Sequence, residues 1–135
     1  MGYSATSYLK ILEDNLPDIM EPGLTFMQDN APIHNVKKTM EWLEEKGIPL
    51  MEWPPFSPDL NPIENAWSQL KNELHKRFPN IEKLPGGQEK VREEMKKALN
   101  ETWDHMKPEY FKTLCNSMPD RVQAVIKAKG WYTKY

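Results

Sequence analysis

The chain of 135 residues has the size of one compact domain, long enough to bury a core and too short for a multidomain enzyme. Its 18 Lys and Arg residues against 20 Asp and Glu residues give a formal net charge of −2, which excludes an overall positive field that would draw the chain to nucleic acid. A single cysteine excludes an internal disulfide, and no apolar run approaches the roughly 20 residues of a membrane span, so we expect a soluble intracellular protein.

The first half of the chain alternates helical and strand-like patterns. Residues 3–20 repeat apolar side chains at helical spacing, which predicts an amphipathic helix. The short apolar run 24–28 predicts a strand, and residues 34–46 predict a second helix that ends before a glycine. Residues 48–53 predict a second strand. A strand, a helix and a strand in this order indicate a parallel pair with a right-handed crossover.

Helices dominate the second half. Four prolines make residues 54–62 a stiff loop, and Asn61 followed by Pro62 supplies the N-cap and first residue of the next helix. Further helical patterns cover about 88–106 and, with one interruption, about 108–129. The sequence therefore predicts an α/β fold with two short parallel strands and about five helices. We expect three further side chains to be buried: Trp53, Trp67 and Cys115.

Two carboxylates follow the predicted strands. Asp29 stands at the end of the first strand, and Glu64 lies in the first turn of the helix that follows the second. Functional groups gather beyond the carboxyl ends of parallel strands, so the two side chains could face each other. Carboxylates are the ligands of hard divalent cations, which activate attacking oxygens and stabilise leaving ones in phosphodiester chemistry.

Each of these residues also has an ordinary structural interpretation. Asp29 could form a turn or cap a helix through its own backbone contacts. Glu64 stands three residues after Asn61, the place of a capping-box carboxylate. His34 could be a ligand or a proton carrier, but a lone histidine near a helix start is more often a cap or a polar packing residue. Spacing alone favours these structural roles.

Two longer segments resemble a known family. Residues 27–34 (MQDNAPIH) and 53–67 (WPPFSPDLNPIENAW) are similar to the second and third catalytic motifs of mariner-like transposases, which are D-D-E endonucleases. Between Asp29 and Glu64 lie 34 residues, the spacing of the branch whose triad ends in Glu. The closing segment 117–130 also resembles the family, so the likeness covers most of the chain.

The resemblance implies a ribonuclease H-like fold in which Asp29 and Glu64 hold Mg²⁺ or Mn²⁺. It implies hydrolysis of a DNA strand at a transposon end, followed by attack of the new 3′-hydroxyl on target DNA, which is DNA transposition and integration in the nucleus. Other motif positions are expected to support the carboxylates or their loops: Asn30, His34, Ser57, Asp59, Asn61 and Asn65.

A complete family member carries an N-terminal helix-turn-helix region and a strand with the first catalytic Asp, followed by two more strands. The resemblance thus implies that residues 1–135 are the C-terminal part of the catalytic domain, a partial fold lacking the N-terminal strands. We expect little strand transfer from this chain alone. Exposed strand edges should be covered in a homodimer, by strand exchange, or by a polypeptide carrying the N-terminal half.

Two other functions compete with the enzymatic one. The chain could be a truncated or domesticated non-catalytic remnant that serves as a self-associating protein-interaction module. Simple DNA binding has weaker support, because the basic residues Lys71, Lys76 and Arg77 on one predicted helix are also what a solvated face carries.

Overall fold

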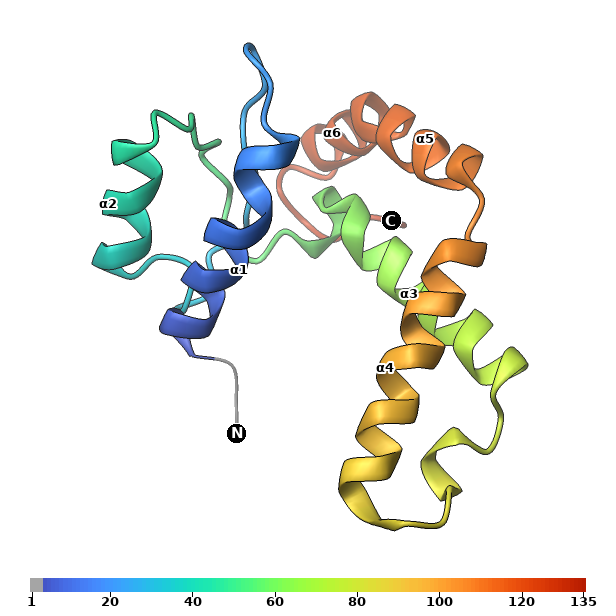
Figure 1. Ribbon diagram of the computed structural model, residues 1–135. Helices are drawn as coiled ribbons and strands as arrows, with labels where there is room; N and C mark the ends of the chain where they lie inside the picture. The colour runs from blue at the N-terminus through green and yellow to red at the C-terminus, as the bar shows by residue number, and fades with distance from the viewer. Residues whose placement is uncertain (1–3) are drawn as a thin grey trace. The chain divides into compact units, whose positions relative to one another are not determined.

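The computed structural model describes residues 4–135, which form six α-helices and two short 3₁₀ helices (Figure 1). The length predicts one domain, but the chain forms two compact units, and the boundary between them falls in the proline-rich loop. Unit 1 ends at Phe56, and unit 2 comprises Ser57–Tyr135. Over residues 4–135, no helix combines the length and the apolar character needed to cross a membrane.

Unit 1 opens with helix α1, Ala5–Ile19. Ser4 caps it, because its Oγ accepts the Ser7 N–H at 3.2 Å while Ser7 Oγ accepts the Ser4 N–H at 2.8 Å. Three leucines at helical spacing form the buried face: Leu9, Leu12 and Leu16.

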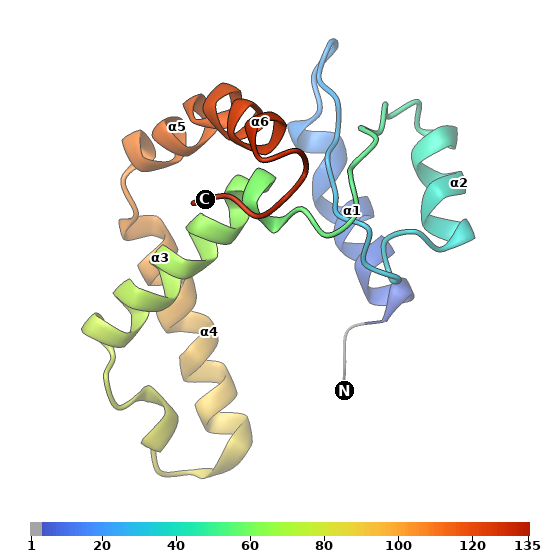
Figure 2. The same cartoon turned by 180° about the vertical axis from the view of Figure 1, so that it is seen from behind.

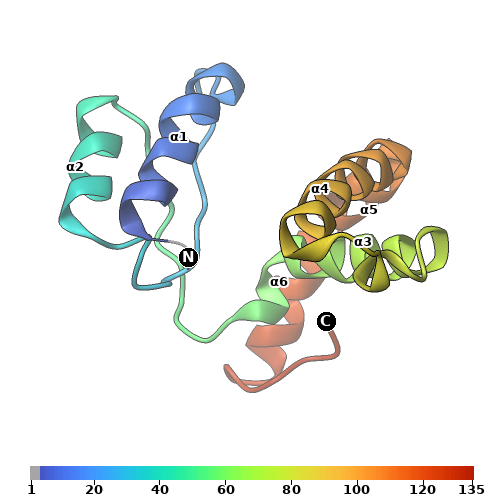
Figure 3. The ribbon, with the colours of Figure 1, turned by 60° about the horizontal axis from the view of Figure 1, so that its bottom comes forward.

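Helix α2, Lys37–Glu45, lies beside α1 (Figure 3). Its Leu43 packs with Leu12 and Leu16 in the core of the unit, which partly buried Trp42, Ile48 and others complete. Helix α2 begins three residues later than the sequence predicts, because the preceding residues form turns in which the His34 N–H bonds to the Ala31 carbonyl.

The predicted pair of parallel strands is wrong. Within residues 4–135 the only β structure is one parallel bridge between Phe26 and Leu50, in which the Phe26 N–H donates to the Pro49 carbonyl and the Met51 N–H to the Phe26 carbonyl, both at 2.8 Å. The next bond toward Leu24 would need an N–H at position 49, and proline has none. The α/β, partial ribonuclease H-like expectation is therefore corrected to a helical fold with a single bridge.

Unit 2 is helical throughout. A 3₁₀ turn at Pro58–Leu60 leads into α3, Pro62–Arg77, and a second one at Ile81–Lys83 leads into α4, Gly87–His105. Helices α3 and α4 pack side by side (Figures 1 and 2). Their core includes Leu74, Ile81 and Ala98.

The last predicted helical region is two helices rather than one interrupted helix. Helix α5 spans Pro108–Asn116 and α6 spans Met118–Lys127, so the six α-helices exceed the expected five. Two burial expectations fail here: Cys115 is exposed, and Trp67 is 44% exposed. Trp53 in unit 1 is half-buried. Trp67 lies in an aromatic cluster with Trp103, whose ring centroid is 6.0 Å away.

Candidate carboxylate sites

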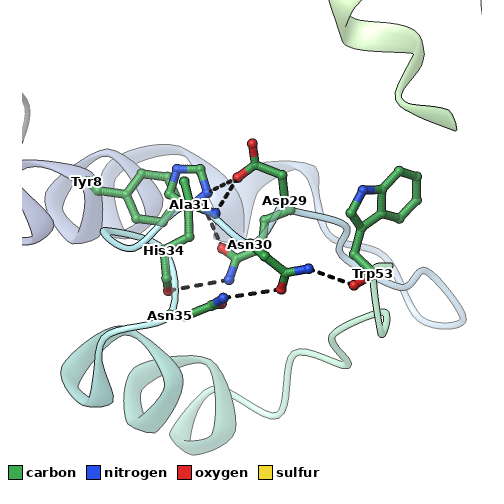
Figure 4. A network of polar contacts seen from close by, with 8 residues as sticks. Tyr8, Asp29, Asn30, Ala31, His34, Asn35 and Trp53 are labelled. Carbon is green, nitrogen blue, oxygen red and sulfur yellow. Dashed lines mark hydrogen bonds and ion pairs between the residues drawn. The ribbon is translucent and has the colours of Figure 1, made fainter. Parts of the chain in front are cut away.

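Asp29 lies in the turn that follows Phe26 in unit 1 (Figure 4). Its Oδ1 accepts the Ala31 N–H at 2.9 Å, which is an Asx turn, so the structural role that spacing favoured is present. The same oxygen lies 2.7 Å from His34 Nδ1. The direction of that nitrogen does not meet hydrogen-bond geometry, and the buried Nδ1 has no hydrogen-bond partner. The two atoms are therefore close together but do not form a hydrogen bond. Both contacts use Oδ1, and the Asp29 side chain is 49% exposed.

Tyr8 of α1 supports this turn by packing its ring against that of His34. The two rings stack with centroids 4.1 Å apart. The Tyr8 hydroxyl donates to Gln28 Oε1 at 2.7 Å, and Gln28 Nε2 donates to the His34 carbonyl at 3.4 Å. Burial, with a smaller contribution from the negative charge of Asp29, raises the pKa of Tyr8 to about 12. The phenol therefore stays protonated and remains a donor at neutral pH.

Asn30 connects the turn to the segment after the bridge. Its Nδ2 donates to the Trp53 carbonyl at 2.7 Å, and its Oδ1 accepts a hydrogen bond from Asn35 Nδ2 at 3.2 Å (Figure 4). The residues on both sides of Asp29 are thus held to neighbouring backbone, and the turn has a defined shape.

Glu64 stands exposed in the first turn of α3 in unit 2. Asn61 is the N-cap, and its Oδ1 accepts the Ile63 N–H at 3.2 Å. A capping box would need the Asn61 N–H for the Glu64 carboxylate, but that N–H donates to the Pro58 carbonyl at 3.0 Å. The structural role expected for Glu64 is therefore not observed, and its carboxylate is not committed to closing the helix.

A buried arginine of α6 fixes the start of α3. Arg121 is 2% exposed, and each nitrogen of its guanidinium donates one bond. These bonds run to the Asp59 carbonyl at 2.8 Å, to Asn65 Oδ1 at 2.7 Å and to Ser117 Oγ at 2.8 Å. Asp59 and Asn65 flank Asn61 and Glu64 in the sequence, so the guanidinium holds both sides of the helix start.

Two tyrosines complete this cluster. The Tyr110 hydroxyl of α5 donates to the Asn65 carbonyl at 3.0 Å, and the ring of Tyr135 lies 4.7 Å from the guanidinium carbon of Arg121. The aromatic face covers a planar cation, an attractive arrangement.

The structure gathers the expected supporting residues around each carboxylate separately. Asn30 and His34 surround Asp29, while the Asp59 carbonyl and the side chains of Asn61 and Asn65 surround the start of α3. The Ser57 carbonyl accepts the Leu60 N–H in the 3₁₀ turn. The sequence did not single out four residues of these frameworks: Tyr8, Gln28, Tyr110 and Arg121. Gln28 and Arg121 lie within segments that resemble the family, and this resemblance was the only sequence signal that could have pointed to them.

The basic residues proposed for DNA contact are mostly engaged with acids. Lys76 Nζ lies 2.8 Å from Glu73 Oε1, and Arg77 Nη2 donates to Glu101 Oε1 at 2.6 Å. Lys71 is exposed on α3. The first pair lies along one exposed helix face, and the second joins α3 to α4.

The donor chemistry of both carboxylates suits a hard divalent cation, because each is an exposed oxygen ligand on a well-defined turn. Among residues 4–135, no three His, Cys, Asp or Glu side chains come together as a metal-binding group. Further ligands would have to be water, substrate or other protein segments.

Comparison with known proteins gives a consistent result. Residues 3–85 match the family described as DDE superfamily endonuclease, a span that includes both carboxylates. The chain is 35% identical over 133 residues to the transposable element Tcb2 transposase of Caenorhabditis briggsae, covering 93% of this chain and 45% of that protein. It is 36% identical over 114 residues to the transposable element Tc1 transposase of Caenorhabditis elegans, covering 84% and 38%. The chain therefore spans less than half the length of these relatives.

Proposed function

The chain belongs to the family of DDE superfamily endonucleases, and on this premise we propose that it forms the C-terminal part of the catalytic domain of a mariner-like DNA transposase. The single observation that carries the proposal is the extent of the family match, which spans both carboxylate turns. In this proposal the complete protein cleaves a DNA strand and joins it to target DNA, in the nucleus.

The family implies a divalent metal, which we propose to be Mg²⁺ or Mn²⁺. Such ions activate the attacking oxygen and stabilise the leaving one. Asp29 and Glu64 would each supply a carboxylate ligand. The Ala31 N–H holds the Asp29 carboxylate through Oδ1, with His34 Nδ1 close beside that oxygen, and Arg121 fixes the helix start that carries Glu64.

A Mn²⁺ titration followed by electron paramagnetic resonance tests this role on the full chain. We expect Asp29→Asn and Glu64→Gln each to weaken Mn²⁺ binding by at least the roughly tenfold that loss of a supporting group around a metal costs. Asp18→Asn on α1 and Asp104→Asn on α4 remove exposed carboxylates as controls and should leave the affinity unchanged. Equal affinity of all four variants would contradict the proposal.

The 135 residues alone should not nick supercoiled plasmid in Mg²⁺ or Mn²⁺, because we propose that a further carboxylate comes from another part of the protein. Nicking that Asp29→Ala abolishes would show that expectation to be wrong.

A non-catalytic remnant that self-associates as a homodimer is the second candidate, and one observation favours it: residues 4–135 contain no group of three metal-ligating side chains. The same titration separates the two functions. Wild-type chain that binds no Mn²⁺ and forms a dimer in light scattering would favour the remnant.

A further inference from the structure

The last fifteen residues differ in charge from the rest of the chain. Residues 121–135 contain four basic side chains and no Asp or Glu, whereas the chain as a whole carries a net charge of −2. Arg121 is buried, but Lys127, Lys129 and Lys134 are exposed. The segment that closes unit 2 is therefore basic and presents three exposed lysines on a slightly acidic chain.

The same segment exposes two large aromatic side chains. Trp131 is 73% exposed and Tyr132 is 77% exposed, and their rings meet edge to face with centroids 5.5 Å apart. Their packing within the unit is slight, so burial does not explain an indole and a phenol at these positions.

The segment has a defined path. It turns sharply after α6, where the Gly130 N–H donates to the Val125 carbonyl and the Trp131 N–H to the Ala128 carbonyl, both at 3.0 Å. It then returns toward the start of α3 (Figure 2), where the Tyr135 ring covers Arg121. Both ends are anchored, and the residues between them form an arch.

We propose that this arch, residues 127–135, binds unpaired DNA next to the α3 turn that carries Glu64. The three lysines would contact phosphates, while Trp131 and Tyr132 stack on bases. Basic residues alternating with exposed aromatic rings are the usual means of binding single strands, because every base offers a face for stacking. The bases of a duplex are already stacked on one another, so exposed rings favour a strand whose bases are unpaired.

The anchoring of the arch explains why it belongs to this site. Tyr135 stacks on the guanidinium that bonds to the Asp59 carbonyl and to Asn65 Oδ1. A strand lying along the arch would thus be guided toward the first turn of α3. This inference rests on the proposed function for its biological meaning, although the binding itself needs no metal.

Fluorescence anisotropy of a labelled oligothymidine strand tests the aromatic part of the proposal, with the full chain in EDTA. We expect Trp131→Ala to bind about tenfold more weakly or worse, and Trp131→Phe, which keeps a stacking face, to remain within about threefold of wild type. A blunt duplex of the same length should bind more weakly than the single strand. Equal binding by wild type and Trp131→Ala, or no binding by either, would overturn the proposal.

A salt series tests the lysines. Substituting Lys127 and Lys129 by Gln should lower the slope of log affinity against log salt by about 0.7 for each lysine removed. The matched control substitutes Lys38 and Lys112, which are exposed on α2 and α5, by Gln and should leave the slope unchanged. Equal slopes for the two double variants would also overturn the proposal.

Two further measurements separate the explanations. Circular dichroism should give the same unfolding midpoint for all variants, since the substituted side chains are exposed. Light scattering would detect a dimer that Trp131→Ala dissolves; such a result without DNA binding would make the arch a protein contact and overturn the proposal. Because EDTA removes metal, failure of the Mn²⁺ titration leaves this result standing, and the reverse also holds.

Discussion

The frameworks around the two carboxylates differ in how far along the chain they reach. Around Asp29, the side-chain hydrogen bonds join residues 2, 5, 6, 20 and 23 positions apart, all within unit 1. Around the α3 turn, the Tyr110 bond and two of the three Arg121 bonds join residues 45, 56 and 62 positions apart, and the third, to Ser117, joins residues 4 positions apart, all within unit 2. One turn is shaped mainly by its own neighbourhood, and the other is shaped by the far end of its unit.

The difference also concerns the type of group at the centre. Asp29 is supported by neutral amides, a phenol and an imidazole, several of them exposed to solvent. The α3 turn depends on a buried cation with three oxygen partners. A buried charge that loses its partners is costly, and so are partners that lose their charge. We therefore expect unit 2 to be the more sensitive to a single change.

Arg121→Leu should have the largest effect. The substitution leaves the Asp59 carbonyl, Asn65 Oδ1 and Ser117 Oγ without their donor, and we expect the free energy of unfolding of unit 2 to fall by about 3 kcal/mol or more. Hydrogen exchange read peptide by peptide in urea measures it for each unit. Arg92→Leu at an exposed position of α4 is the control and should cost less than about 0.5 kcal/mol. A similar cost for both would remove the proposed contrast.

Tyr8→Phe should have an intermediate effect in unit 1. It deprives the buried Gln28 Oε1 of its donor, which should lower the free energy of unfolding by about 1.5 kcal/mol at neutral pH. The raised pKa of Tyr8 means that folding favours the neutral phenol. The stabilisation is therefore complete below pH 10 and is lost as the pH rises through about 12. Urea unfolding across this range should show wild type and variant converging, and parallel curves would contradict the assignment.

Asn30→Ala should have the smallest effect. It removes the bonds to the Trp53 carbonyl and from Asn35, and because both are exposed we expect a cost of about 0.5–1 kcal/mol. Faster hydrogen exchange confined to residues 28–35 and 49–53 would be the signature. Glu52→Ala, at an exposed neighbouring position, should leave that exchange unchanged. An effect as large as that of Arg121→Leu would show that unit 1 depends on single contacts as strongly as unit 2.

The contrast between short-range and long-range contacts also explains which features the sequence could predict. Short-range signals succeeded: the Asx turn of Asp29 and the Asn61 cap of α3 depend on side chains bonding to backbone two residues away. Helical spacing located the helices, but the last predicted helical region is divided into α5 and α6. The apolar runs predicted extended backbone, but a ladder also needs N–H groups in register, and Pro49 lacks the one that would extend the bridge toward Leu24.

The spacing of residues along the sequence could not predict the long-range contacts. An arginine in a helix with polar neighbours ordinarily faces water, and nothing near residue 121 shows that its partners stand at positions 59 and 65. Glu64 illustrates the reverse error: its spacing from Asn61 fits a capping box, but the Asn61 N–H is already used by the 3₁₀ turn before it.

The reach of Arg121 also sets an order of events during synthesis. The contacts that shape the Asp29 turn involve residues 8 to 53, so every partner has been made before the first residue of α3. The turn that carries Glu64 has no such independence, because its central donor is added only at position 121. As the chain emerges from the ribosome, one carboxylate turn can take its final shape early, while the other must wait until the residues of α6 have been made.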